Sequence, residues 1–309
     1  MIIGTDFTRN LNMFKLPESC VSDLSEHDEL MFIDYDSIDY ESLKRVEVFF
    51  GDRLTTDIVR HMDNLKWIHL ASSGYEKLSG INKDIIVTNS RGVFDYPVVS
   101  TVLAFIFALS RGLHHCVRSD MNRHSFDKYF NEINDVFSQS CLIVGMGSIG
   151  NKLASVCENL NMDVVGIKTS GDGNRIFSLK DLQSVVPRAD FIINLLPLNV
   201  DTKDVFDMNI FNKMKKSAFF INVGRGGTVV EKDLLLALKN NQIAGAGLDV
   251  FQNEPLKKDS KLWKLDNVII TPHVAGVSRC HWKRSYGLFS ENLKLYRTGS
   301  FLNNEVNVS

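Results

Sequence analysis

Short apolar runs alternate with amphipathic stretches along the whole chain, a pattern typical of α/β proteins. In the second half, six apolar runs have the length and composition of buried parallel strands. They are CLIVG, DVVGI, FIINLL, AFFINV, AGAGLDV and VIITPH, starting at residue 141. Helical patterns lie between most of these runs, so this part of the chain predicts a doubly wound parallel sheet.

The first 95 residues repeat this alternation with shorter elements, and strands are expected at residues 46–50, 67–70 and 85–88. Pro97 favours the start of a long apolar helix that ends near Gly112. A last amphipathic stretch over residues 278–296 predicts a helix that returns to the first domain.

The 309 residues exceed what one core organises well, so we predict two doubly wound parallel-sheet domains. The hinges are expected near residues 96 and 276. A Rossmann dinucleotide-binding domain, residues 96–276, is then inserted in a smaller flavodoxin-like substrate domain, residues 1–95 plus 277–309.

Composition excludes several classes of protein. The chain has 35 Lys and Arg against 37 Asp and Glu, which leaves no excess positive charge for nucleic acid. The longest apolar stretch, residues 102–109, is too short to cross a bilayer, and the first residues lack the pattern of a secretory signal. Five irregularly spaced cysteines without a CxxC pair favour reduced thiols in the cytoplasm, and no metal site is expected.

The run GMGSIG follows a predicted strand and begins a predicted helix, which is the setting of a phosphate-binding turn. Glycines in this motif allow a tight turn, a close approach of the backbone to a pyrophosphate and close packing of helix on strand. The alternative is a glycine-rich turn without a ligand. The predicted cofactor-binding residues here are Gly145, Met146, Gly147, Ser148, Ile149 and Gly150.

The end of the second strand bears on the choice of cofactor. An acidic residue about 20 positions after the glycines usually accepts hydrogen bonds from the adenosine ribose. Here Lys168, Thr169 and Ser170 stand instead, a cation and two hydroxyls suited to a 2′-phosphate. The sequence therefore favours NADP(H) over NAD(H), although solvated loop residues are an alternative and Asp172 keeps NAD(H) open.

Three later segments complete a pattern of motifs. They are INVGRGGTVVEKDLLLAL at 221–238, GAGLDVFQNEPL at 245–256 and TPHVAG at 271–276. With GMGSIG, they resemble the D-2-hydroxyacid dehydrogenase family, which includes glyoxylate/hydroxypyruvate reductases and phosphoglycerate dehydrogenases. The resemblance covers residues 95–276 closely and the remainder loosely. It implies hydride transfer between a nicotinamide cofactor and a small 2-keto acid or (R)-2-hydroxy acid.

The same segments contain the groups that this chemistry needs. Reduction of a carbonyl needs a proton donor, a cation that holds the oxygen and the neighbouring carboxylate, and a group that keeps the acid protonated. His273 is expected as the acid and base, Glu254 as the carboxylate that raises its pKa, and Arg225 as the cation. The family assigns these roles to the matching positions. Singly, each residue could be an ordinary loop or core residue.

Further candidates follow from the resemblance. Asp249 is expected to orient the nicotinamide carboxamide, with capping of the strand end as the alternative. Leu196 and Pro197, after Leu195, resemble the family's segment on the adenine side, although core packing explains them equally well. Cofactor contacts are also expected from Val223 and Gly224.

On the substrate side, LASSGYEKL resembles the family's loop whose backbone N–H groups bind the substrate carboxylate. Ser73 and Gly74 are the candidates, whereas Tyr75 either shapes the pocket or simply packs. The glutamate often found near the start of the following helix is replaced by Ser100 and Thr101. This departure puts the fine orientation of the substrate in doubt, and the sequence does not choose among 2-keto acids.

The expected partners are a small 2-keto or 2-hydroxy acid and a second copy of the chain, because the family and the apolar helix at 98–109 favour a homodimer. Burial inside one subunit explains the same helix. A nucleotide-sensing, corepressor-like binding protein of the same fold, without significant turnover, is the alternative function.

Overall fold

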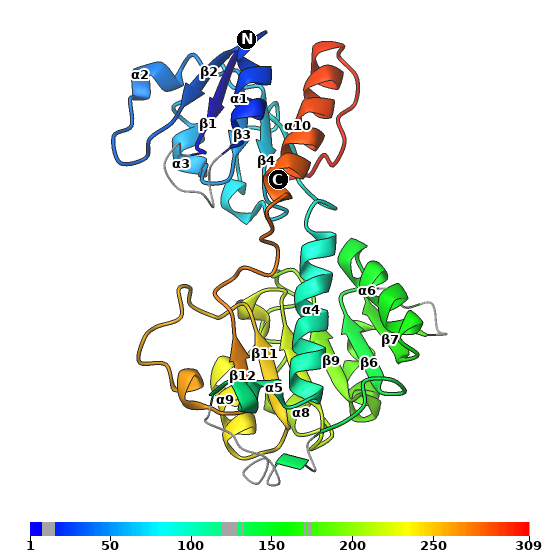
Figure 1. Cartoon of the computed structure of the whole chain (residues 1–309). Helices are drawn as coiled ribbons and strands as arrows, with labels where there is room; N and C mark the ends of the chain where they lie inside the picture. The colour runs from blue at the N-terminus through cyan, green and yellow to red at the C-terminus, as the bar shows by residue number, and fades with distance from the viewer. Residues whose placement is uncertain (8–15, 119–128, 131–132, 170, 172–174, 309) are drawn as a thin grey trace. The chain divides into compact units, whose positions relative to one another are not determined.

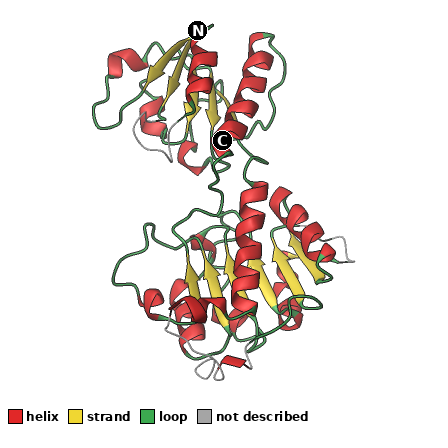
Figure 2. Cartoon of the chain, in the orientation of Figure 1, coloured by secondary structure: helices red, strands yellow, loops and turns green. Residues whose placement is uncertain are grey.

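The computed structural model describes residues 1–7, 16–118, 129–130, 133–169, 171 and 175–308 (Figure 1). The chain divides into two compact units: unit 1 is Met1–Phe94 with Ser278–Ser309, and unit 2 is Asp95–Val277. Each unit contains one all-parallel sheet with helices packed on it (Figure 2). The predicted fold class, two doubly wound parallel-sheet domains, is therefore confirmed.

Unit 1 has a five-stranded sheet in the order β2-β1-β3-β4-β5, which is the flavodoxin-like order. Its strands are β1 Ile2–Thr5, β2 Glu29–Phe32, β3 Val48–Gly51, β4 Trp67–Leu70 and β5 Ile86–Asn89. Its helices are α1 Glu18–Ser25, α2 Tyr40–Leu43, α3 Thr56–Val59, the 3-10 turn η1 Glu76–Leu78 and α10 His281–Arg297.

Alternate residues of these strands enter two separate cores because successive side chains of a strand point to opposite faces. On one face, Phe50 and Trp67 pack with Phe289 of α10. On the other face, Phe49 and Ile68 join a second apolar cluster. Helix α10 therefore returns the end of the chain to unit 1, as the amphipathic stretch predicted.

Unit 2 has a seven-stranded sheet in the order β12-β11-β10-β9-β6-β7-β8, the Rossmann order extended by one strand. Its strands are β6 Ser140–Val144, β7 Asp163–Lys168, β8 Ile176–Ser178, β9 Phe191–Asn194, β10 Phe219–Asn222, β11 Gly245–Leu248 and β12 Val268–Ile270. Its α-helices are α4 Asp95–Ser110, α5 Leu113–Arg118, α6 Ser148–Asn159, α7 Leu182–Val185, α8 Met208–Phe211 and α9 Glu231–Lys239. Short 3-10 turns are η3 Leu179–Asp181, η4 Val186–Arg188, η5 Gly226–Thr228 and η6 Lys261–Lys264.

The central strands β9, β10 and β11 are buried along their whole length because helices cover both faces of the sheet. Helix α4 packs on β10, β11 and α6, and buries Phe105 directly against Gly247. Much of the apolar surface of α4 is thus accounted for within its own unit. It begins two residues before the expected Pro97, which lies in its first turn.

Three strands were not predicted: β1, β2 and β8. Strands β2 and β8 lie at sheet edges and are half-exposed for the most part, so their sequences lack a strong apolar run. Strand β1 is short and contains Gly4.

Among the described residues no helix is both long and apolar enough to traverse a membrane. All five cysteines are free.

Candidate active site

The loops that follow the strands of unit 2 meet at the carboxyl edge of its sheet, because all seven strands are parallel. Most of the predicted site residues lie in these loops. They are Gly145–Gly150 after β6, Lys168 and Thr169 at the end of β7, Leu196 and Pro197 after β9, Val223–Arg225 after β10, Asp249 after β11 and His273 after β12. Ser170 and Asp172 lie outside the described residues.

His273 and Glu254 form a direct pair. The imidazole Nδ1 lies 2.6 Å from Oε2 of Glu254, and the side chains are 51% and 33% exposed. The other carboxylate oxygen, Oε1, accepts a hydrogen bond of 3.0 Å from the amide of Phe251, which fixes the carboxylate. Among the described residues, Nε2 of His273 has no hydrogen-bonding partner. The pair therefore presents one ring nitrogen to solvent or to a ligand.

The backbone of His273 is held in the left-handed region, with φ of 54°. This conformation is strained for a residue with a Cβ atom and persists only where neighbours enforce it. Asp249 does so: its carboxylate accepts hydrogen bonds from the amides of Val274 (2.8 Å) and Ala275 (2.9 Å) and from the hydroxyl of Thr271 (2.5 Å). Both oxygens of this buried side chain are thus occupied, which favours the capping role over a contact with the cofactor.

Arg225 lies in a loop that packs tightly on the neighbouring loop. A Cβ atom on Gly226 would lie 1.9 Å from the backbone of Phe251, so only glycine fits there. The guanidinium Nη1 of Arg225 donates to the carbonyl of Gly224 at 2.9 Å. Since Phe251 also fixes Glu254, the loops of Arg225 and of the His273–Glu254 pair are joined through one segment.

Two asparagines support the Arg225 loop and were missed by the sequence reasoning. Asn194 donates from Nδ2 to Oδ1 of Asn222 (2.9 Å) and to the hydroxyl of Thr228 (2.7 Å). Asn222 Oδ1 also accepts from the amide of Gly224 at 3.2 Å, and Thr228 donates to the carbonyl of Arg225 at 2.7 Å. All three side chains are buried. The available signal was that the predicted strands FIINLL and AFFINV both contain an asparagine directly after three apolar residues.

The turn after β6 fits a dinucleotide. Gly145 has φ of +117°, and a Cβ atom on Gly150 would lie 2.3 Å from the Gly145 carbonyl, so turn and helix need both glycines. Space is open around Gly147. In the described part of the chain, the amides of Gly147, Ser148 and Ile149 have no hydrogen-bonding partner. A helix N-terminus with free amides beside open space suits a pyrophosphate.

A second polar group adjoins this turn. The Ser148 hydroxyl donates to Asp95, the first residue of α4. Lys152 Nζ lies 3.6 Å from the same carboxylate and 3.9 Å from the centroid of the Tyr96 ring. The start of α4 is thereby tied to the phosphate-binding turn through contacts that no sequence motif predicted.

The remaining predicted cofactor contacts divide into exposed and buried residues. Lys168, Thr169 and Pro197 are exposed, whereas Leu196 and Val223 are buried. Gly224 packs on the backbone of the segment that contains Leu196. The exposed residues can reach a ligand, whereas the buried ones can contribute little more than backbone atoms and packing.

An apolar hollow of about 380 Å³ adjoins the His273–Glu254 pair. It is lined by Phe251, Glu254, Pro255, Leu256, Trp263, Ile270, Pro272 and His273. The pair therefore borders an apolar surface on one side.

The predicted carboxylate-binding loop lies at the carboxyl end of β4 in unit 1, where Ser73 and Gly74 are half-buried and Tyr75 is exposed. At the position where the family often has glutamate, Ser100 donates to the Tyr96 carbonyl (2.8 Å). Thr101 donates to the Ala275 carbonyl (3.2 Å) and so braces the loop after His273.

Comparison with known proteins gives consistent matches. A family model described as D-isomer specific 2-hydroxyacid dehydrogenase, NAD binding domain, matches residues 103–275. A probable 2-ketogluconate reductase of Dictyostelium discoideum is 33% identical over 253 residues, 76% of this chain and 74% of that protein. Glycerate dehydrogenase of Methylorubrum extorquens is 34% identical over 237 residues, 73% of this chain and 74% of that protein.

The fold has close structural neighbours. An NADPH-dependent glyoxylate/hydroxypyruvate reductase from Sinorhizobium meliloti, solved in complex with NADP and sulfate, has a TM-score of 0.79. The match covers 99% of this chain and 98% of that chain at 23% sequence identity. At this identity, the likeness concerns the fold alone.

Proposed function

This chain belongs to the D-isomer-specific 2-hydroxyacid dehydrogenase family, and we propose that His273, Glu254 and Arg225 carry out its reaction. The protein is an NAD(P)-dependent oxidoreductase that interconverts a small 2-keto acid and the (R)-2-hydroxy acid. The observation that carries the assignment of residues is the 2.6 Å contact between His273 and Glu254, which leaves Nε2 open.

His273 is the acid in reduction and the base in oxidation. When bound, the reduced nicotinamide supplies a hydride to the carbonyl carbon. The protonated imidazole donates the proton on Nε2 to the carbonyl oxygen, and the ring is left neutral. Glu254, which contacts Nδ1, orients the ring and stabilises its positive charge before the transfer. One hydride and one proton thus convert the ketone to an alcohol.

Arg225 holds the substrate. A guanidinium forms two parallel hydrogen bonds with a planar carboxylate, or bonds one carboxylate oxygen and the adjacent carbonyl oxygen. In either mode it stabilises the negative charge that develops on the carbonyl oxygen. We assign the amides of Ser73 and Gly74 to the substrate carboxylate as well.

The dinucleotide is held by the amides of residues 147–149, by Met146, Val223 and Gly224, and by the segment of Leu196 and Pro197. Asp249 contributes by fixing the His273 loop. Lys168 and Thr169, exposed at the end of β7, favour a 2′-phosphate and hence NADP(H). Ser170 is included in this assignment on sequence grounds alone.

The test is a screen of purified protein with NADPH and NADH against glyoxylate, hydroxypyruvate, pyruvate and larger 2-keto acids. We expect the absorbance of the reduced nicotinamide to fall with at least one acid. If the absorbance falls with none of the acids and neither cofactor, the residue assignments are wrong.

A Lys168→Glu variant tests the preference for NADP(H). It should lose affinity for NADPH while retaining affinity for NADH. Lys180→Glu, at an exposed position elsewhere in unit 2, is the control.

Unit 2 is assigned to the dinucleotide and unit 1 to the substrate. We also propose a homodimer, which sedimentation of the purified protein tests directly. A cytoplasmic location agrees with five free cysteines and is tested by fractionation of cells. The relatives named above are a reductase and a dehydrogenase, and neither supports a corepressor without turnover.

A further inference from the structure

The loop after β4 in unit 1 contains two consecutive residues, Ser73 and Gly74, whose carbonyl oxygens accept hydrogen bonds from within the unit. The carbonyl of Ser73 accepts a hydrogen bond from Nδ2 of Asn89 at 2.8 Å. The carbonyl of Gly74 accepts one from the hydroxyl of Ser72 at 3.2 Å. For the amides of Ser73 and Gly74 there is no hydrogen-bonding partner among the residues that the structure describes. Two consecutive free N–H groups on a braced loop form an anion-binding surface.

The carboxylate of Asp52 anchors this loop through a hydrogen bond. Asp52 directly follows β3, and its Oδ1 accepts a hydrogen bond of 2.8 Å from the amide of Ser72. Ser72 is the residue before the two open amides. The orientation of the loop thus depends on the carboxylate of Asp52.

A second carboxylate lies next to it. Asp6, at the end of β1, is buried and accepts hydrogen bonds from the amides of Asp52 (3.1 Å) and Arg53 (2.6 Å). It also accepts from the hydroxyl of Tyr35 at 3.2 Å. The Arg53 guanidinium lies 4.7 Å from the centroid of the Tyr35 ring. Arg53 acts on Asp6 and Lys77 acts on Asp52 as the facing cations.

These cations do not offset the desolvation of the two acids. Burial raises the pKa of Asp6 above its usual value. Burial and the neighbouring charge of Asp6 raise the pKa of Asp52 to about 6. Asp52 therefore changes its charge near pH 6, while Oδ1 can accept from Ser72 in either state.

We propose that Asp52 is a positioning residue for substrate binding, whose hydrogen bond holds the Ser72–Gly74 loop and whose negative charge weakens binding of the substrate carboxylate. The inference rests on the proposed role of Ser73 and Gly74. When Asp52 is neutral, the free amides face an anion without an opposing charge behind them. When it is ionised, the loop keeps its geometry and the substrate is repelled.

The experiment separates the hydrogen bond from the charge. Asp52→Asn keeps an acceptor oxygen and removes the charge, whereas Asp52→Ala removes both. KM for the keto acid is measured between about pH 5 and about pH 8, with Asp84→Asn, an exposed acid of the same unit, as the control for net charge. The dissociation constant of NADPH is measured in parallel.

In the unmodified protein, KM should rise about three- to tenfold as the pH rises through the range, which is about the effect of two unit charges that interact through bulk water. KM of Asp52→Asn should stay near the low value and rise much less with pH than that of the unmodified protein. Asp84→Asn should behave as the unmodified protein, and Asp52→Ala should have a high KM at every pH. Affinity for NADPH should not change. A rise of KM with pH that is as large in Asp52→Asn as in the unmodified protein overturns the proposal.

Binding of oxamate, an unreactive analogue of a keto acid, is measured by calorimetry with the same proteins. This readout needs no turnover, so it stands even if no keto acid is reduced. The same pattern in the dissociation constant supports the role of Asp52. Binding that is independent of pH in the unmodified protein contradicts it.

Discussion

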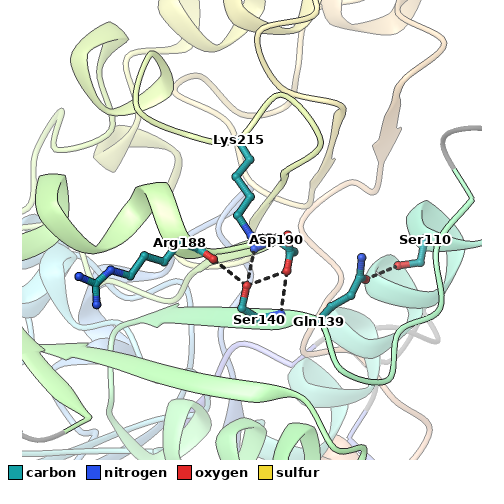
Figure 3. Close-up of polar contacts among 6 residues, drawn as sticks. All are labelled: Ser110, Gln139, Ser140, Arg188, Asp190 and Lys215. Atoms are coloured by element: carbon teal, nitrogen blue, oxygen red, sulfur yellow. Dashed lines mark hydrogen bonds and ion pairs between the residues drawn. The ribbon is translucent and has the colours of Figure 1, made fainter.

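The two edges of the unit 2 sheet use similar polar groups for opposite purposes. At the amino edge, the carboxylate of Asp190 accepts hydrogen bonds from the amide (2.9 Å) and the hydroxyl (2.7 Å) of Ser140. It also accepts one from Nζ of Lys215 at 2.7 Å. Figure 3 shows these contacts. At the carboxyl edge, the His273–Glu254 pair is partly exposed and leaves Nε2 open. A network whose bonds are closed stabilises the fold, whereas one that keeps a group open is available for chemistry.

The electrostatics agree with this difference. Burial acts to raise the pKa of Asp190, but hydrogen bonds from Lys215 and Ser140 hold this pKa below its ordinary value. Variants at the amino edge should therefore change stability and leave turnover intact. Variants of the partly exposed His273–Glu254 pair should do the reverse.

The largest expected effect follows from His273→Gln. Without the proton donor, kcat should fall about 10²–10⁴-fold, whereas the dissociation constant of NADPH and the thermal unfolding temperature should hardly change. Steady-state kinetics and calorimetry check the two parts. A variant that keeps its turnover would show that the open nitrogen is not used.

Asn222→Leu should affect both properties, because a closed network supports the open edge. The substitution leaves the Nδ2 group of Asn194 and the amide of Gly224 without an acceptor, at a cost of about 1–3 kcal/mol each. The loop of Arg225 should move, so KM for the keto acid should rise as well. Chemical denaturation measures the loss of stability, and steady-state kinetics measure KM. A loss of stability with unchanged KM would show that the asparagine network does not position Arg225.

Asp190→Asn should lower the free energy of unfolding by about 1–3 kcal/mol and leave kcat unchanged. The matched control is Asp163→Asn, whose ion pair with Arg175 is 2.9 Å long but highly exposed. Such a surface pair contributes about 0–1 kcal/mol. Equal losses in the two variants would contradict the special role of the closed network.

The smallest expected effect is the pH dependence of this stabilisation. Because folding lowers the pKa of Asp190 from its usual 3.8, its ionised form stabilises the protein above that pH. The contribution is lost as the pH falls through the lower pKa of the folded state. The difference in unfolding free energy between the unmodified protein and Asp190→Asn should therefore shrink as the pH falls below 3.8. A difference that grows as the pH falls would mean that folding raises the pKa of Asp190, which contradicts the account.

Local patterns were sufficient for the architecture and for the positions of the predicted loops. GMGSIG lies after a strand and before a helix, and His273 and Arg225 follow neighbouring parts of one sheet, because parallel strands bring their ends to one edge. Strand limits were less accurate: β3 is Val48–Gly51 rather than 46–50, since Val46 is buried without belonging to the strand.

Contacts between distant segments could not be predicted from the sequence. The bond from Ser72 to Asp52 joins residues 20 positions apart, and that from Ser148 to Asp95 joins residues 53 apart. Nothing in the local sequence distinguishes Asp52 from an ordinary surface acid. Burial and the neighbouring Asp6 give it its properties, and both arise only in the folded unit.

The most direct test of the central claim uses NADPH with deuterium on the transferable position of the nicotinamide ring. With a keto acid that the protein reduces, the account predicts an (R)-2-hydroxy acid with one deuterium on the carbon that bears the hydroxyl, and little product from His273→Gln. Oxidation of the cofactor without deuterium in the acid, or an (S) product, would contradict it.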